Sequence, residues 1–273
     1  MQITDWAHCP WDQVPEADLA PALQVPSMLT LAEARLYHWL GRQAEGCGAV
    51  VDLGAFAGGS AARLLSGLML GPSTARLYAY DRFTADPRVR AAFLYPAGMA
   101  RTDDPDILPL VQRHLAPWQD RVSLIRGEIA DQEWHRAAVE ILAVDAAKST
   151  RLNDHIAAQF YRHLVPGRSV LIHQDFLQIT QPWLAVQMLA LTKFFTPVAF
   201  TGPDCVVFEC RKKLNPGAVQ RAATLAMTDE DLITGLHAAA SEFAPFVPPE
   251  RILAMIPKLR ANPGVRIAWQ MKN

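Results

Sequence analysis

The sequence lacks an excess of charge of either sign, a long apolar run and a regular cysteine pattern. Its 26 basic and 27 acidic residues nearly cancel, whereas nucleic acids and anionic membranes attract strongly basic surfaces. No apolar stretch reaches the roughly 18 residues that cross a bilayer. The four cysteines lack the paired spacing of a zinc site, so we expect free thiols. These absences predict a small-molecule partner, with no nucleic acid and no membrane.

The segment 1–27 lacks the basic start and apolar core of a secretion signal, so we expect a cytoplasmic protein. It contains four prolines and little periodicity, which predicts an irregular leader. With 273 residues, 51% of them hydrophobic, the chain can bury the core of one catalytic domain and an added helical segment. The leader and the helical segment are both candidate surfaces for a homodimer.

Strand and helix patterns alternate through residues 28–213, which we predict to form the main domain. The last two predicted strands are joined by Gly202-Pro203-Asp204, which is too short for a helical crossover and predicts an antiparallel hairpin. We therefore predict an α/β fold with a doubly wound, mostly parallel seven-stranded sheet ending in that hairpin, and a helical extension over 214–273. The predicted strands are 49–53, 75–80, 122–126, 140–144, 169–172, 198–201 and 205–210, and the helices between them include 60–70, 151–164 and 182–195.

A glycine-rich turn follows the first predicted strand. The segment 50–60 reads VVDLGAFAGGS, in which an apolar strand breaks into a turn that opens a helix and lets a ligand approach the backbone. The second strand ends near Asp81, whose carboxylate can accept both ribose hydroxyls of an adenosine. A dinucleotide fingerprint needs glycine at the position of Phe56, because the backbone there nearly touches a pyrophosphate. The spacing therefore favours S-adenosylmethionine, which has no phosphate.

Three further motifs accompany the turn: MLT at 28–30, VDAAK at 144–148 and HQD at 173–175. With these motifs the chain resembles class I S-adenosylmethionine-dependent methyltransferases, and among them the small-molecule O-methyltransferases of the macrocin, catechol and caffeoyl-CoA types. The resemblance implies methyl transfer to a hydroxyl of a small natural-product or sugar-like acceptor. It implies donor contacts at Met28, Gly54, Ala55, Phe56, Gly58, Ser60, Asp81, Arg82, Gly127, Glu128, Ile129 and Asp145.

The resemblance also implies a divalent cation, Mg²⁺, beside the acceptor oxygen. Its ligands would be Asp145, Gln174 and Asp175. The chain departs from the family pattern in having Ala147 where a second aspartate stands, and Gln174 where a carboxylate is usual.

The candidate catalytic residues are Asp145, His173 and Asp175. The methyl group of a sulfonium is already activated, so the protein has to align the displacement and help remove the acceptor's proton. His173 is partly deprotonated near neutral pH and is the candidate base if no metal binds. Strand alternation predicts that His173 and Asp175 share one side. Lys148 is interpreted as a solvated residue.

Two other functions stay open at this stage. One is a nicotinamide-dependent oxidoreductase on the same type of sheet, against which Phe56 argues. The other is a non-catalytic S-adenosylmethionine-binding or assembly module, which Ala147 and the helical extension leave open.

Overall fold

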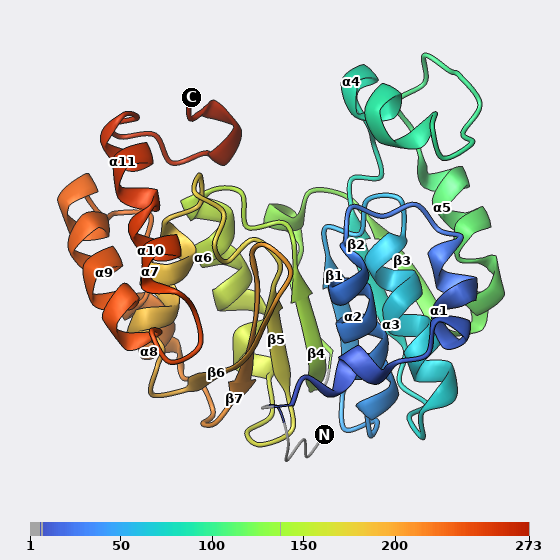
Figure 1. Ribbon diagram of the computed structural model, residues 1–273, viewed down its shortest axis with the longest axis horizontal. Coiled ribbons are helices and arrows are strands. Elements are labelled where there is room, and N and C mark those ends of the chain that lie inside the picture. Colours follow the sequence, from blue (N-terminus) through green and yellow to red (C-terminus); the bar gives the residue numbers. More distant parts are fainter. Residues whose placement is uncertain (1–5, 7, 137, 273) are drawn as a thin grey trace.

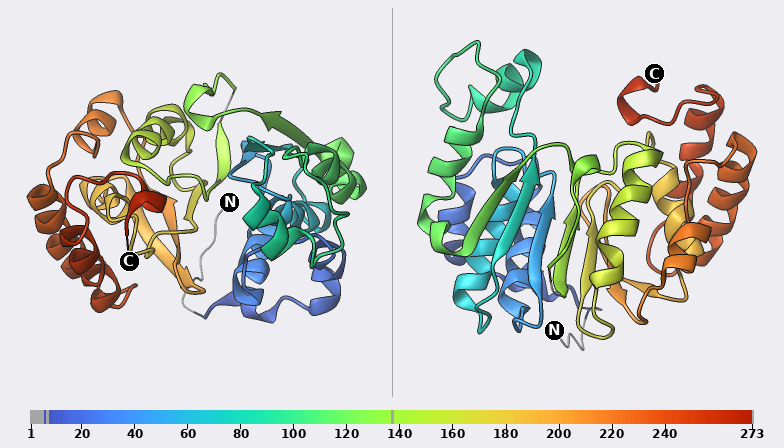
Figure 2. Two further views of the ribbon diagram at one scale, coloured as in Figure 1. Left: turned by 90° about the horizontal axis from the view of Figure 1, so that it is seen from above. Right: turned by 180° about the vertical axis from the view of Figure 1, so that it is seen from behind.

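The structure is a computed structural model that describes residues 6, 8–136 and 138–272. Its centre is a seven-stranded sheet covered by helices on both faces (Figures 1 and 2). The strand order is β3-β2-β1-β4-β5-β7-β6, and β7 runs antiparallel to both of its neighbours, β5 and β6. The predicted mostly parallel sheet with a terminal hairpin is therefore confirmed. The strands are β1 (Ala49–Leu53), β2 (Leu77–Asp81), β3 (Val122–Arg126), β4 (Val139–Val144), β5 (Val170–His173), β6 (Phe195–Thr201) and β7 (Cys205–Cys210).

Both faces of the sheet are buried, as a parallel sheet between two helical layers requires. In β1, for example, Val50 and Val51 point in opposite directions and belong to separate hydrophobic cores. The core around Val50 lies under the α2 and α3 layer, and the core around Val51 lies under the α6, α7 and α9 layer. These helices are α2 (Leu31–Gln43), α3 (Gly59–Leu70), α6 (Thr150–Gln159), α7 (Trp183–Ala190) and α9 (Asp229–Glu242).

An insertion follows β2 and stands above one edge of the sheet. Its first part, α4 (Pro87–Val89) and the π-helical turn η2 (Arg90–Leu94), projects beyond the strand ends at the top right of Figure 1. Its second part, α5 (Leu108–His114) and the 3-10 segment η3 (Ala116–Arg121), returns along the sheet to β3. The insertion therefore places side chains over the carboxyl ends of the strands.

The carboxyl-terminal segment is helical, as predicted, and shares a core with the sheet. Its helix α9 begins at a capping box between Thr228 and Asp231, and Leu232 and Leu236 are buried in the same core as β4 and β5. The division at residue 213 stays a prediction. The remaining elements are α8 (Pro216–Arg221), α10 (Pro249–Leu253), α11 (Met255–Arg260) and the 3-10 turn η6 (Ala268–Gln270).

The leader and the helix after β5 differ most from the sequence-based predictions. The leader is not irregular throughout, because it contains the 3-10 turn η1 (Pro10–Gln13) and the helix α1 (Glu16–Leu23), which buries Leu19 and Ala22. The helix predicted over 182–195 ends at Ala190, since the ladder between β6 and β7 extends to Phe195 and draws the chain into the sheet. None of the described helices is long and apolar enough to span a membrane.

The helices α2 and α3 cross at two glycines. A Cβ at Gly67 would lie 1.9 Å from the carbonyl oxygen of His38, and one at Gly41 would lie 2.2 Å from that of Leu64. These contacts are with backbone atoms, so no side-chain rotation relieves them. The two helices can therefore pack at this distance only while both positions lack a side chain.

We expect Gly67→Ala to destabilise the fold even though alanine favours helix. The added methyl forces α2 and α3 apart, at a cost of about 1–3 kcal/mol that outweighs the propensity gain. Thermal melts measure the effect. The control is Gly217→Ala in α8, where the new Cβ would meet side-chain atoms alone, Nη1 of Arg221 at 3.3 Å and Oδ1 of Asn215 at 3.5 Å. Equal melting temperatures for Gly67→Ala and the native chain would contradict the packing argument.

Candidate functional site

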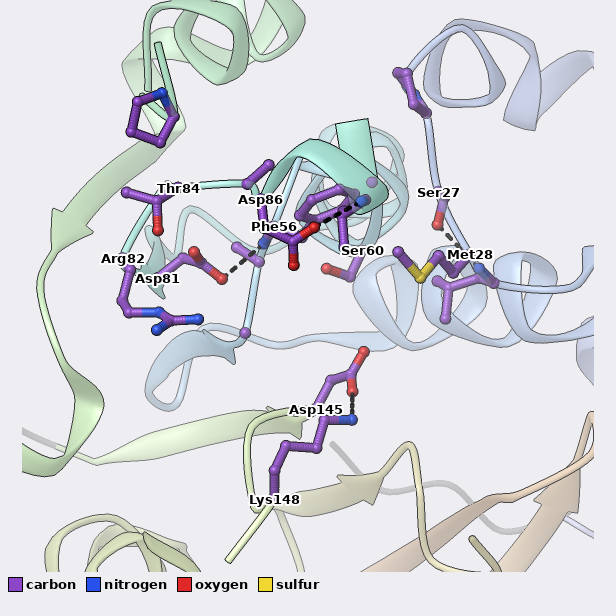
Figure 3. Close-up of a pocket in the computed structure, with 18 of the residues that line it drawn as sticks. Ser27, Met28, Phe56, Ser60, Asp81, Arg82, Thr84, Asp86, Asp145 and Lys148 are labelled. Atoms are coloured by element: carbon purple, nitrogen blue, oxygen red, sulfur yellow. Dashed lines mark hydrogen bonds and ion pairs between the residues drawn. The ribbon is translucent and has the colours of Figure 1, made fainter. Parts of the chain in front are cut away.

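A cavity of about 610 Å³ lies at the carboxyl ends of β1, β2 and β4 (Figure 3). In a doubly wound sheet this is the edge where ligands bind. Its walls come from the glycine turn, the ends of β2 and β4, the insertion and the segment before α2. The lining side chains labelled in Figure 3 are Ser27, Met28, Phe56, Ser60, Asp81, Arg82, Thr84, Asp86, Asp145 and Lys148.

The glycine turn after β1 takes the shape that its sequence predicts. Gly54 has φ +96°, and a Cβ there would lie 2.8 Å from the carbonyl oxygen of Asp145. Gly58, with φ +89°, is the N-cap of α3 and does not line the cavity. Gly59 lies against Pro26, whose oxygen would be 2.5 Å from an added Cβ. The glycines at 54 and 59 therefore allow other parts of the backbone to approach the turn closely.

Phe56 adopts a left-handed conformation at φ +45° and connects the turn to β2. Its N–H donates to Oδ2 of Asp81 at 3.0 Å, while Oδ1 of Asp81 accepts from the N–H of Phe83 at 2.7 Å. Burial raises the pKa of Asp81, and the hydrogen bonds from Phe56 and Phe83 oppose that rise. A carboxylate has about four acceptor positions, so Asp81 retains capacity for two hydroxyl groups in the cavity.

A second cavity of about 530 Å³ shares its floor with the first. It includes Gly54, Asp81, Asp145 and Lys148, and it extends to the loop after β3, where it meets Gly127, Glu128 and Ile129. Arg82 lies at both cavities and approaches Glu128 at 3.9 Å. The structure thus brings nearly all of the predicted donor-binding residues to one continuous region. Ala55 and Ser60 line only the first cavity.

Lys148, which the sequence analysis interpreted as a solvated residue, is ion-paired and only 34% exposed. Its Nζ donates to Oδ1 of Asp145 at 2.7 Å and also pairs with Oδ2 of Asp175, which accepts from Nε2 of Gln181 at 2.7 Å. Burial alone would lower the pKa of Lys148, but the two carboxylates raise it above its usual value. Lys148 is therefore protonated at neutral pH. In the sequence, its position three residues after Asp145 indicates that the two side chains can form an ion pair.

Asp145 stands between the cavity and this ammonium group. Its side chain is 41% exposed and lines both cavities. Burial raises its pKa, Lys148 opposes that rise, and Asp175 adds to it. Asp145 is thus a carboxylate of more than usual basicity that faces the ligand space.

The predicted metal ligands are not brought together. Gln174 turns away from the cavity: its Oε1 accepts from the Tyr37 hydroxyl at 3.0 Å, and its Nε2 donates to Oε1 of Glu33 at 2.6 Å. The ammonium of Lys148 lies between the other two predicted ligands. Within residues 6, 8–136 and 138–272, no three acidic, histidine or cysteine side chains are grouped as metal ligands. The residues present therefore do not fit the predicted Mg²⁺ site.

His173 does not reach the cavity, contrary to its predicted role as a base. It is 1% exposed, its Nε2 pairs with the Tyr161 hydroxyl at 2.8 Å, and it packs against Phe176 and Phe208. Burial lowers its pKa to about 3, although Asp175 opposes this. His173 and Asp175 also have different surroundings, because regular strand alternation ends with β5 at His173. Of the three predicted catalytic residues, Asp145 lines the two cavities, and His173 and Asp175 line neither.

No family model matches the sequence, and no curated protein matches it. Among solved structures, the chain is similar to the O-methyltransferase NovP, with a TM-score of 0.54 and 13% identity over 68% of this chain and 82% of that one. It is also similar to a Corynebacterium glutamicum protein, with a TM-score of 0.50 and 12% identity over 76% of this chain and 96% of the other. At such identities the similarity concerns the fold. The predicted Rossmann-like methyltransferase fold is confirmed.

Replacing Lys148 with Met would leave Asp145 and Asp175 facing each other without a cation. One of them then keeps its proton to a higher pH in the folded chain than in the unfolded chain, so stability falls as pH rises. We expect the loss of melting temperature relative to the native chain to be larger at about pH 8 than at about pH 5. Lys148→Arg, which keeps the charge, is the control. An equal loss at both pH values would show that the cation does not hold the two carboxylates.

Proposed function

We propose that the chain binds S-adenosylmethionine at the carboxyl edge of its sheet and transfers the methyl group to a hydroxyl of a small acceptor. One observation carries the proposal: the glycine turn at 54–60 and Asp81 line the same cavity as Asp145 and Lys148. The proposed donor site therefore lies beside Asp145, a carboxylate that can accept a proton, and beside the ammonium group of Lys148. The similarity to NovP supports the fold on which this proposal rests.

The cavity walls suggest how the donor lies. The ribose hydroxyls bind Asp81, whose carboxylate is already oriented by the N–H groups of Phe56 and Phe83. The methionine part then lies over the turn near Gly54 and Met28, and the base lies toward Gly127. This order follows the strand order of the sheet, in which β1 lies beside β2 and β2 beside β3.

A nicotinamide dinucleotide fits this turn less well. A pyrophosphate binds to free backbone N–H groups at a glycine turn. Here the N–H of Phe56 already donates to Asp81, and the Phe56 side chain lines the cavity where the phosphates would lie. A sulfonium donor needs no such N–H cradle.

The reaction is an in-line displacement, in which the acceptor oxygen attacks the methyl carbon from the side opposite to sulfur. The acceptor oxygen forms a bond to the methyl carbon, the bond from that carbon to sulfur breaks, and its electron pair stays on sulfur as S-adenosylhomocysteine forms. Asp145 accepts the hydroxyl proton, since its raised pKa and its exposure to the cavity suit a general base. Lys148, which stays protonated, stabilises the negative charge that develops on the acceptor oxygen.

The acceptor space is largely apolar. Met28 is 56% exposed beside Phe56 and Val89, and a further cavity of about 310 Å³ continues between Met28 and Phe93 of the insertion. Apolar walls favour binding of the apolar part of an acceptor, because binding removes that surface from water. We infer a natural-product acceptor with an apolar skeleton and a hydroxyl, in preference to a free sugar.

S-adenosylhomocysteine should raise the melting temperature of the native chain by several degrees, whereas NADH should not. A ligand at 100 times its Kd stabilises a protein by about 2.7 kcal/mol. Asp81→Asn should weaken S-adenosylhomocysteine binding by about 10-fold or more in calorimetry, because an amide cannot accept from both hydroxyls and both N–H groups. Asp103→Asn, at an exposed aspartate of the insertion, is the control. Stabilisation by NADH alone would overturn the proposal.

Methyl transfer from labelled donor to a panel of hydroxyl compounds should persist in excess EDTA and fall about 100-fold in Asp145→Asn. The variant loses the base while Lys148 still provides a cation, so we expect the transfer rate to fall by a larger factor than the affinity for the donor. Liquid chromatography of the labelled product measures the rate. Donor binding without transfer to any acceptor would instead identify a non-catalytic binding module.

A further inference from the structure

Trp269 is the most exposed of the large apolar side chains in the described part of the chain, at 72% of its surface. It lies in η6, far in sequence from every predicted site residue, yet it lines the second cavity. A tryptophan side chain offers a large apolar area, and water in contact with it is released when a flat ligand covers the ring. Its position at a cavity makes it a candidate contact for a ligand.

The backbone around Trp269 is anchored to the loop after β4. Ile267 forms an antiparallel bridge with Ser149, and the N–H of Ala268 donates to the carbonyl of Lys148 at 2.9 Å. Arg266 adds an ion pair with Asp229 at 2.7 Å. The loop that carries Asp145 and Lys148 is therefore held on its outer side by the carboxyl-terminal tail.

The tail is also fixed on the far side of Trp269. Met271 is 8% exposed, and the N–H of Lys272 donates to Oδ1 of Asn262 at 2.7 Å. With both flanks held, the backbone at Trp269 has a defined place beside the second cavity. Figure 1 and the right panel of Figure 2 show this red tail and the insertion at the same end of the molecule.

The second cavity has the composition of a purine site. Asp81 supplies the ribose acceptor. Apolar walls come from Ile129 after β3, Ala146 after β4 and Leu152 in the first turn of α6. Trp269 is the aromatic side chain that lines it in the described structure. Purine rings bind such sites by stacking on aromatic faces. A base attached to a ribose on Asp81 lies within this cavity.

We propose that Trp269 stacks on the adenine of the bound methyl donor, which makes the carboxyl-terminal tail a part of the donor site. This inference rests on the proposed function, since it assigns a wall to the same ligand. It also gives the helical extension a role, because α9 and η6 together hold the tail against the β4 loop through Arg266 and Ala268.

The test measures binding of S-adenosylhomocysteine and of 5′-methylthioadenosine by calorimetry. Trp269→Ala should weaken both ligands by a similar factor, about 10-fold, because both carry the adenosine half. Trp269→Phe, which keeps a ring, should stay within a few-fold of the native chain. The matched control is Gln270→Ala, an exposed neighbour in the same turn that lines neither cavity.

The outcomes separate this inference from the proposed function. If the native chain binds no S-adenosylhomocysteine, the proposed function fails first. If the native chain binds and Trp269→Ala binds equally well, only the role of Trp269 is overturned. Equal loss in Trp269→Ala and Trp269→Phe, or loss with S-adenosylhomocysteine alone, would also overturn stacking on adenine. Melting temperatures near that of Gln270→Ala establish that the variants fold.

Discussion

The candidate site depends on the close contact between two loops, the turn after β1 and the loop after β4. They meet at Gly54, where a side chain would lie 2.8 Å from the backbone oxygen of Asp145. The N–H of Asp145 donates to the carbonyl of Leu53 at 2.9 Å, which fixes the loops relative to each other. Because of this contact, the glycine turn and the Asp145 carboxylate face one cavity.

The charge balance within the site follows from the same loop. Lys148, three residues after Asp145, brings a fixed positive charge between two carboxylates that would otherwise repel each other. This arrangement occupies the place where the family resemblance implied a metal ion. Asp145 remains open to the cavity, so the ion pairs leave one carboxylate available for a proton.

Two segments outside the common sheet give the site its particular walls. The insertion after β2 contributes Thr84, Asp86 and Val89 on one side, and the carboxyl-terminal tail contributes Trp269 on the other. Both pack onto hydrophobic cores of the domain, and the tail is also held by its backbone pairing with the loop after β4. The sheet positions the glycine turn, Asp81 and Asp145, and these two segments form the walls on either side of them.

The sequence by itself determined the sheet, the terminal hairpin, the glycine turn and the acid at Asp81. These features depend on local patterns: strand and helix periodicity, short turns and backbone conformations that favour glycine. Of the donor contacts that the family resemblance implied, all but Gly58 line the two cavities, and their role stays a prediction.

Only the tertiary structure decided which polar side chains after β4 and β5 face the cavity. His173 enters an aromatic core, Gln174 binds Tyr37 and Glu33, and Lys148 joins Asp145 to Asp175. Trp269 reaches the site only through the pairing of the tail with the β4 loop. The physical reason is that each of these positions depends on contacts between segments far apart in the chain. Local patterns do not encode such contacts, because regular alternation stops where a strand ends.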